Sequence, residues 1–156
     1  MTPIHDSFTL KRRLPARPAT VFAASSDPAV KRRWFVDSDG PGWSTSDYAL
    51  DFRVGGRETG SFVLAEGPGR GTHANVTHYL DIAAPRRIVD AYTMAHDGAI
   101  HSASLATVEF LDEAGETLLR HIEQGVYHPS RDGVAGRQKG WTHLLSALDA
   151  SLRQAA

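Results

Sequence analysis

The apolar residues near the C-terminus recur at helical spacing. They are Val134, Trp141, Leu144, Leu145, Leu148 and Leu152. Steps of three, four and seven residues place these side chains on one stripe of an α-helix. The other flank is polar, and we expect it to face water; it contains Arg137, Gln138, Lys139, Thr142, His143, Asp149 and Arg153. The pattern therefore predicts a long helix over residues 134–152 with one buried stripe.

Three glycines interrupt the first half of this predicted helix. Gly133, Gly136 and Gly140 are unusual there, because each glycine inside a helix costs about 1 kcal/mol relative to alanine. Such glycines either weaken the first turns or allow a close approach to neighbouring backbone. We interpret this half of the helix as its adjustable part.

Upstream of residue 128 the pattern changes to alternation of apolar and polar positions. Alternation with a period of two predicts half-buried strands over 6–14, 48–52, 59–65, 74–82, 88–94, 104–111 and 117–124. Turn signals such as Asp-Gly, Gly-Gly and Pro-Arg separate most of them. In the fourth segment we expect the side with Val76, His78, Leu80 and Ile82 to face inward. Consecutive strands joined by short turns form an antiparallel meander.

Two short helices are predicted between the first and second strands. Pro18 suits a first helical turn, and Asp27-Pro28 reads as a cap followed by a first-turn proline. The basic run 31–33 predicts a solvated helix face, and residues 37–46 predict a loop that holds Trp43. The whole pattern belongs to the α+β class: a curved antiparallel sheet of about seven strands covered by the C-terminal helix.

Composition restricts the function classes. The 156 residues predict a single domain over 1–156. A net charge of −1 gives no reason to expect nucleic acid as a partner. The absence of cysteine excludes disulfides and a cysteine nucleophile. Without a signal peptide or a long apolar run we expect a cytoplasmic protein with no membrane insertion. The eight histidines lack metal-binding spacing, so we expect no metal and no cofactor.

Several segments together resemble one known family. They are the run 17–22, Asp27-Pro28, the run 31–35, the glycine turn 52–56, the strand pair around Pro85-Arg86-Arg87, the strand 104–110, and 123–127 followed by Gly140-Trp141. In order and spacing they resemble helix-grip (START-like, SRPBCC) proteins. More specifically, they are similar to bacterial proteins related to the C-terminal domain of the activator of the heat-shock protein 90 ATPase. The resemblance covers about residues 8–152.

The resemblance implies a strongly curved sheet that grips the long helix, with an apolar cavity between them. Members of this superfamily bind lipids, hormones, polyketides or other hydrophobic small molecules, and some catalyse cyclisation or hydrolysis. The co-chaperone role belongs to a larger eukaryotic protein with a separate N-terminal domain that these 156 residues do not include. We therefore expect ligand binding rather than chaperone activation.

The candidate binding residues combine apolar, aromatic and a few polar side chains. They are Trp34, Trp43, Phe52, Phe62, His78, Tyr92, Met94, His121, Glu123, Trp141 and Leu145. Pockets lined by aromatic groups with a few convergent polar groups are the usual ligand sites. The alternative is that these side chains fill an ordinary core.

The last strand carries the candidate catalytic pair. Leu119, His121 and Glu123 share one side and Leu118, Arg120 and Ile122 the other, and periodicity alone does not decide which side faces inward. The family pattern implies that the side with Leu119 is the inner one. A histidine held by a carboxylate can exchange protons near neutral pH.

Three hypotheses follow. The first is a non-enzymatic carrier of a hydrophobic ligand, the second is a cyclase- or hydrolase-like enzyme that uses His121 and Glu123, and the third is a stress-linked protein-interaction adaptor. A homodimer is an open alternative, although the sequence has no heptad or other interface pattern.

Overall fold

The sheet and the helices follow the predicted order. We describe residues 2–129 and 133–155 of a computed structural model. The elements are β1 (Ile4–Leu14), α1 (Pro18–Ser26), α2 (Pro28–Phe35), β2 (Trp43–Leu50), β3 (Arg57–Leu64), β4 (Gly71–Ala83), β5 (Arg87–His96), β6 (Ala99–Glu113), β7 (Glu116–Tyr127) and α3 (Val134–Gln154). The α+β helix-grip prediction is confirmed. Trp43 differs from its prediction, because it begins β2 instead of lying in a loop.

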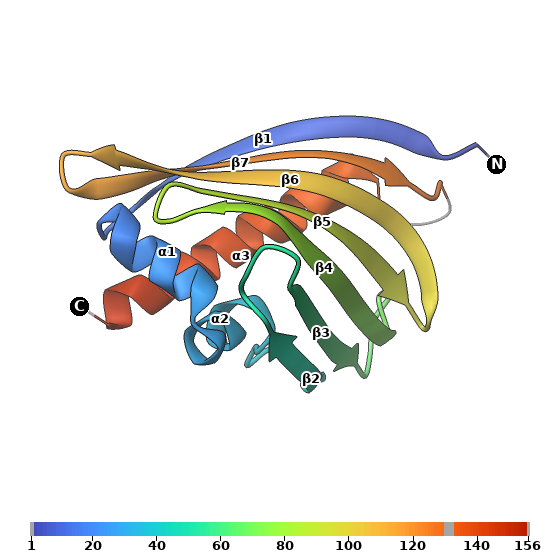
Figure 1. Ribbon diagram of the computed structural model, residues 1–156. Coiled ribbons are helices and arrows are strands. Elements are labelled where there is room, and N and C mark those ends of the chain that lie inside the picture. The colour runs from blue at the N-terminus through green and yellow to red at the C-terminus, as the bar shows by residue number, and fades with distance from the viewer. Residues whose placement is uncertain (1, 130–132, 156) are drawn as a thin grey trace.

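All seven strands form one antiparallel sheet in the order β1-β7-β6-β5-β4-β3-β2. The sheet curves around α3, which crosses its concave side, while α1 and α2 lie near one end (Figure 1). The long crossing from β1 to β2 through α1 and α2 makes these two strands the edges of the sheet. No helix among the described residues is long and apolar enough to cross a membrane.

The apolar stripe of α3 packs into the core as the spacing predicts. Leu145, Leu148 and Leu152 are buried against side chains from α1, α2 and the sheet. Their neighbours in the core are Leu14, Val21, Phe22, Ala24, Trp34, Tyr79, Ile88, Phe110 and Leu119. The core that α3 covers contains residues of five strands and two other helices, so α3 is the element that closes the core.

Leu148 gives the direct test of this closure. Its side chain is 0% exposed, and replacing a buried leucine with alanine removes apolar contacts and leaves a cavity. We expect Leu148→Ala to lower the free energy of unfolding by about 2–5 kcal/mol in urea titrations. Leu144 is half-buried on the same helix and serves as the control. An effect of Leu148→Ala no larger than that of Leu144→Ala would contradict this packing.

A β-bulge in β4 changes the inner side of that strand. Asn75, Thr77 and Tyr79 are buried, whereas His78 is exposed. The pairing with β5 shifts between Tyr79 and Asp81, and beyond that shift Ile82 packs against the core. A one-residue shift reverses the face of every following side chain. The prediction that His78 points inward is therefore wrong, because simple alternation across 74–82 ignored the bulge.

Candidate functional site

The inner side of β7 is the side with Leu119, His121 and Glu123. His121 is 1% and Glu123 0% exposed, whereas Ile122 is exposed on the other side. In the register with β1, Leu10 lies opposite His121 and Phe8 opposite Glu123. Periodicity alone does not decide this orientation, and the structure agrees with what the family resemblance implies. Two ionisable side chains are thus placed under α3.

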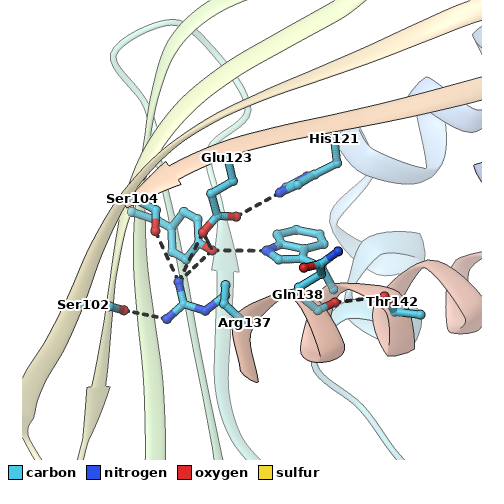
Figure 2. A network of polar contacts seen from close by, with 9 residues as sticks. Ser102, Ser104, His121, Glu123, Arg137, Gln138 and Thr142 are labelled. Atoms are coloured by element: carbon cyan, nitrogen blue, oxygen red, sulfur yellow. Dashed lines mark hydrogen bonds and ion pairs between the residues drawn. The ribbon is translucent and has the colours of Figure 1, made fainter. Parts of the chain in front are cut away.

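Glu123 is the centre of a buried polar network. Its Oε1 accepts a hydrogen bond from the Tyr92 hydroxyl at 2.6 Å and its Oε2 lies 2.9 Å from Nε2 of His121 (Figure 2). Burial alone would raise the pKa of Glu123, but the hydrogen bonds from His121 and Tyr92 outweigh burial and hold the pKa below its ordinary value. Glu123 is therefore an ionised carboxylate at neutral pH.

Arg137 connects α3 to this network. Its guanidinium donates from Nη1 to the Tyr92 hydroxyl at 2.9 Å and from Nη2 to Oγ of Ser102 at 2.5 Å. Nη1 also lies 3.3 Å from Oε1 of Glu123. Figure 2 shows the side chain of Arg137 reaching from the helix toward Ser102, Ser104 and Glu123. The prediction that Arg137 lies on the solvated flank is wrong, because the buried carboxylate attracts its charge inward.

His121 is held in one tautomer and has one unpartnered nitrogen. The ionised carboxylate of Glu123 only accepts hydrogen bonds, so Nε2 of His121 carries the proton in this contact. The other ring nitrogen, Nδ1, is buried and has no partner within the described part of the chain. In the neutral imidazole this nitrogen is an acceptor. The ring packs against the Trp141 indole, with centroids 4.2 Å apart.

A second buried polar cluster, which the sequence pattern does not predict, lies beside the first. Nζ of Lys31 lies 2.8 Å from Oε2 of Glu58, and both side chains are buried. The Tyr48 hydroxyl donates to the same oxygen at 2.7 Å. Burial alone would lower the pKa of Lys31, but the charge of Glu58 outweighs it and raises that pKa. The prediction that the basic run 31–33 is a solvated face is wrong for Lys31, which shares its side of α2 with the buried Trp34.

Asp90 on β5 is a third ionisable group that the sequence did not reveal. It is half-buried and makes no hydrogen bond or ion pair with another described residue. The pKa of Asp90 is raised to about 7, mainly because the carboxyl group is buried. The charge of Lys31 lowers this pKa, and the charges of Glu58 and Glu123 raise it. An unpaired carboxylate with a strongly raised pKa is a typical feature of functional sites.

A small cavity lies where these groups meet. It has a volume of about 40 Å³. Its lining comprises Ser25, Lys31, Trp34, Tyr79, Ile88, Asp90, Val108, Leu119, His121, Trp141, Leu145 and Leu148. One water needs roughly 10–15 Å³ of such space, whereas drug-sized ligands occupy about 300–1,000 Å³. The cavity therefore holds a few waters or one small polar group, and not the whole of a hydrophobic molecule.

The predicted binding residues divide into three groups. Trp34, His121, Trp141 and Leu145 line the cavity, and Tyr92 and Glu123 join it through hydrogen bonds. The remaining five, Trp43, Phe52, Phe62, His78 and Met94, do not line it. Phe52 packs in the core against Phe22 and Tyr79, while Trp43 stacks on Phe62 with centroids 3.8 Å apart. Met94 is half-buried on β5, two residues from Tyr92.

Asp90 provides a pH-dependent prediction. Its folded pKa of about 7 lies above the ordinary value of 3.8, so the folded state binds the proton more tightly and stability falls as pH rises from about 4 to 7. We expect Asp90→Asn to raise the melting temperature strongly at pH 8 and much less at pH 4. A variant that is destabilised equally at both pH values would contradict this environment for Asp90.

The arrangement is suited to acid–base and hydrogen-bond chemistry. Within residues 2–129 and 133–155 no group of three His, Cys, Asp or Glu side chains is placed to hold a metal ion. A carboxylate that fixes a histidine whose second nitrogen is an open acceptor can bind a donor group or take a proton from it. Glu123 and His121 have this geometry.

Comparison with known proteins supports the fold and the family. A family model described as "Activator of Hsp90 ATPase homolog 1-like protein" matches residues 15–153. The Mll3558 protein of Rhizobium loti is 38% identical, with a TM-score of 0.83 over 97% of this chain and 99% of that chain. An uncharacterised protein of Rhizobium leguminosarum is 35% identical, with a TM-score of 0.87 over 98% and 97%.

A more distant structure shares the fold alone. DynU16 is 17% identical, with a TM-score of 0.69 over 96% of this chain and 48% of its own. A comparison with curated proteins finds no match. The family match extends over most of the chain and includes β7, α3 and the polar network between them. The chain therefore belongs to the family of proteins like the activator of Hsp90 ATPase homolog 1, within the helix-grip superfamily.

Proposed function

We propose that this protein binds a lipid-, polyketide- or aromatic-like small molecule between the sheet and α3. The observation that carries the proposal is the buried His121, which Glu123 fixes at 2.9 Å and whose Nδ1 has no partner among the described residues. Buried polar atoms are normally satisfied by protein or by an ordered guest. A ligand group in the adjoining cavity would complete this pairing.

The family supports the hydrophobic character of the ligand. Helix-grip proteins commonly bind hydrophobic molecules in the space between sheet and helix. One structural neighbour, DynU16, is described as a protein of the dynemicin biosynthetic locus, and at 17% identity it supports the fold and not a particular ligand. The aromatic and aliphatic lining of the cavity is consistent with an apolar ligand body.

The small cavity means that the ligand body must displace part of α3. A cavity of about 40 Å³ accommodates only the polar end of such a molecule. Trp141 lines the cavity and is half-buried on α3. A Cβ at Gly140 would meet nothing within 4 Å, so this glycine weakens the helix without serving close packing. We propose that the first half of α3 moves outward on binding.

The experiment is a thermal-shift panel of hydrophobic compounds. A compound present at a hundredfold excess over its dissociation constant should stabilise the protein by about 2.7 kcal/mol. Trp141→Ala should weaken binding of the same compound about tenfold or more, because it removes a large apolar contact from the cavity wall. A panel without any shift would contradict the proposal and would direct attention to protein partners.

A second candidate function is catalysis at the same site. The contact between His121 and Glu123 favours it, since a carboxylate-held histidine is a suitable general base for a hydroxyl or water in the cavity. Turnover of ester substrates by the unmodified protein, abolished in His121→Gln, would establish an enzyme. Binding without turnover would leave the protein as a carrier.

A further inference from the structure

Two residues that line the cavity each have a hydrogen-bond acceptor that no described residue satisfies. One is the carboxylate of Asp90 on β5, and the other is Nδ1 of His121 on β7. Asp90 and Glu123 both pair with Ala106 of β6, one from each side. Asp90 and His121 therefore lie on strands two apart and face the same small space. A guest that donates several hydrogen bonds would satisfy both.

Among the charged groups around the cavity, the carboxylates outnumber the cations by one. Lys31 on α2 is paired with Glu58 on β3 at 2.8 Å, and Arg137 on α3 is paired with Glu123 on β7 at 3.3 Å. Asp90 is the third carboxylate, and the one cation that acts on it, Lys31, is already paired with Glu58. When Asp90 is ionised, these five groups carry a net charge of −1, because two cations face three carboxylates. A cation in the cavity would restore neutrality.

The remaining lining suits an organic cation. Trp34, Tyr79 and Trp141 contribute three aromatic rings to the cavity, and aromatic faces attract ammonium groups, most strongly where water is excluded. The same region already holds one ammonium against a ring: Nζ of Lys31 lies 4.5 Å from the centroid of Phe35. A volume of about 40 Å³ fits a group the size of a protonated amine.

We propose that the cavity is the head-group pocket for the primary ammonium of a hydrophobic ligand, held between the carboxylate of Asp90 and Nδ1 of His121. This inference rests on the proposed function and defines the ligand class as an amphipathic amine. A primary ammonium has three donors, enough for two acceptors at once, whereas a hydroxyl donates only one hydrogen bond. A carboxylate head group would be repelled by Asp90.

The proposal has a pH signature. The pKa of Asp90 is about 7 in the free protein, and a bound ammonium favours the ionised carboxylate. Binding at pH 7 should therefore release about half a proton. The affinity should rise as pH increases from 5.5 to 8. Lys31, Glu58, Tyr79, His121, Glu123 and Arg137 are the other charged or titratable groups around the site.

Isothermal titration calorimetry with octylamine, octanol and octanoate at pH 8 tests the inference. We expect octylamine to bind at least tenfold more tightly than octanol, and octanoate to bind most weakly. Asp90→Asn should weaken octylamine binding at least tenfold and change octanol binding little. Asp47 is exposed on β2 and far along the sheet from β5, so Asp47→Asn is the matched control and should behave as the unmodified protein.

A measurement on the unmodified protein tests the same inference even if Asp90→Asn does not fold. Titration of octylamine at pH 7 in two buffers of different ionisation enthalpy gives the number of protons released, and we expect about half a proton. Equal or tighter binding of octanol or octanoate, or no proton release, would overturn the amine assignment and leave the proposed function standing. Failure of all three compounds to bind would overturn the assignment and count against the proposed function as well.

Discussion

Replacing Glu58 with glutamine should lower the free energy of unfolding by about 3–5 kcal/mol. Glu58 is 1% exposed and lies 2.8 Å from Nζ of Lys31. Glutamine keeps the size of the side chain but removes the charge, so the buried ammonium of Lys31 loses its partner. Removing one partner of a buried ion pair costs more stability than the intact pair contributes. The reason is that the other charge remains buried, with neither a partner nor water around it. Urea titration at pH 7 measures the loss.

Two controls separate this effect from simple loss of a surface charge. Asp51 and Arg53 form an ion pair at 2.9 Å in which both side chains are largely exposed, and Asp51→Asn should cost less than about 1 kcal/mol. The double variant Lys31→Met with Glu58→Gln should recover much of the stability, since no unpaired charge remains. If Glu58→Gln cost no more than Asp51→Asn, Lys31 and Glu58 would not form a buried pair.

Replacing Glu123 with glutamine should have an effect of similar size and should also alter the candidate site. The carboxylate of Glu123 is 0% exposed and holds His121, Tyr92 and Arg137 at once. With a neutral amide the charge of Arg137 loses its counterion, and the tautomer of His121 is no longer fixed. We expect a loss of about 3–5 kcal/mol at pH 7 and loss of any turnover that depends on His121.

The pH dependence of this variant follows from the low pKa of Glu123. A carboxyl group whose folded pKa is depressed stabilises the protein fully above its unfolded pKa of about 4.3, and this contribution disappears as pH falls through the folded value. The difference in stability between the unmodified protein and Glu123→Gln should therefore be greatest near neutral pH and shrink below about pH 4. A difference that stayed constant down to pH 2 would contradict an ionised Glu123.

The backbone architecture could be predicted from the sequence because its signals are local. The helical spacing from Val134 to Leu152 and the alternation in the strands each depend on neighbouring residues, and the structure confirms the elements that they predict. The wrong prediction for β4 also has a local cause, but the apolar–polar pattern does not reveal it. The bulge at Tyr79 and Asp81 shifts the pairing without any glycine or proline at that point, so alternation alone assigned His78 to the wrong face.

The candidate site was only partly predictable because its charges depend on residues far apart in the chain. His121 and Glu123 were found from their shared strand face. Lys31 and Arg137 looked like ordinary solvated residues of amphipathic helices, and only the sheet shows that a buried carboxylate faces each of them. Asp90 gave no sequence signal, since its unusual environment comes from burial and from the neighbouring charges on three other elements.

The central claim is that a hydrophobic small molecule binds between the sheet and α3. The most direct measurement is native mass spectrometry of freshly purified protein, followed by organic extraction and identification of any released compound. We expect a stoichiometric hydrophobic molecule, with its retention reduced in Trp141→Ala, and an amine group on that molecule if Asp90 and His121 form the head-group pocket. Protein that is purified empty and shows no thermal shift with any hydrophobic compound would contradict the claim.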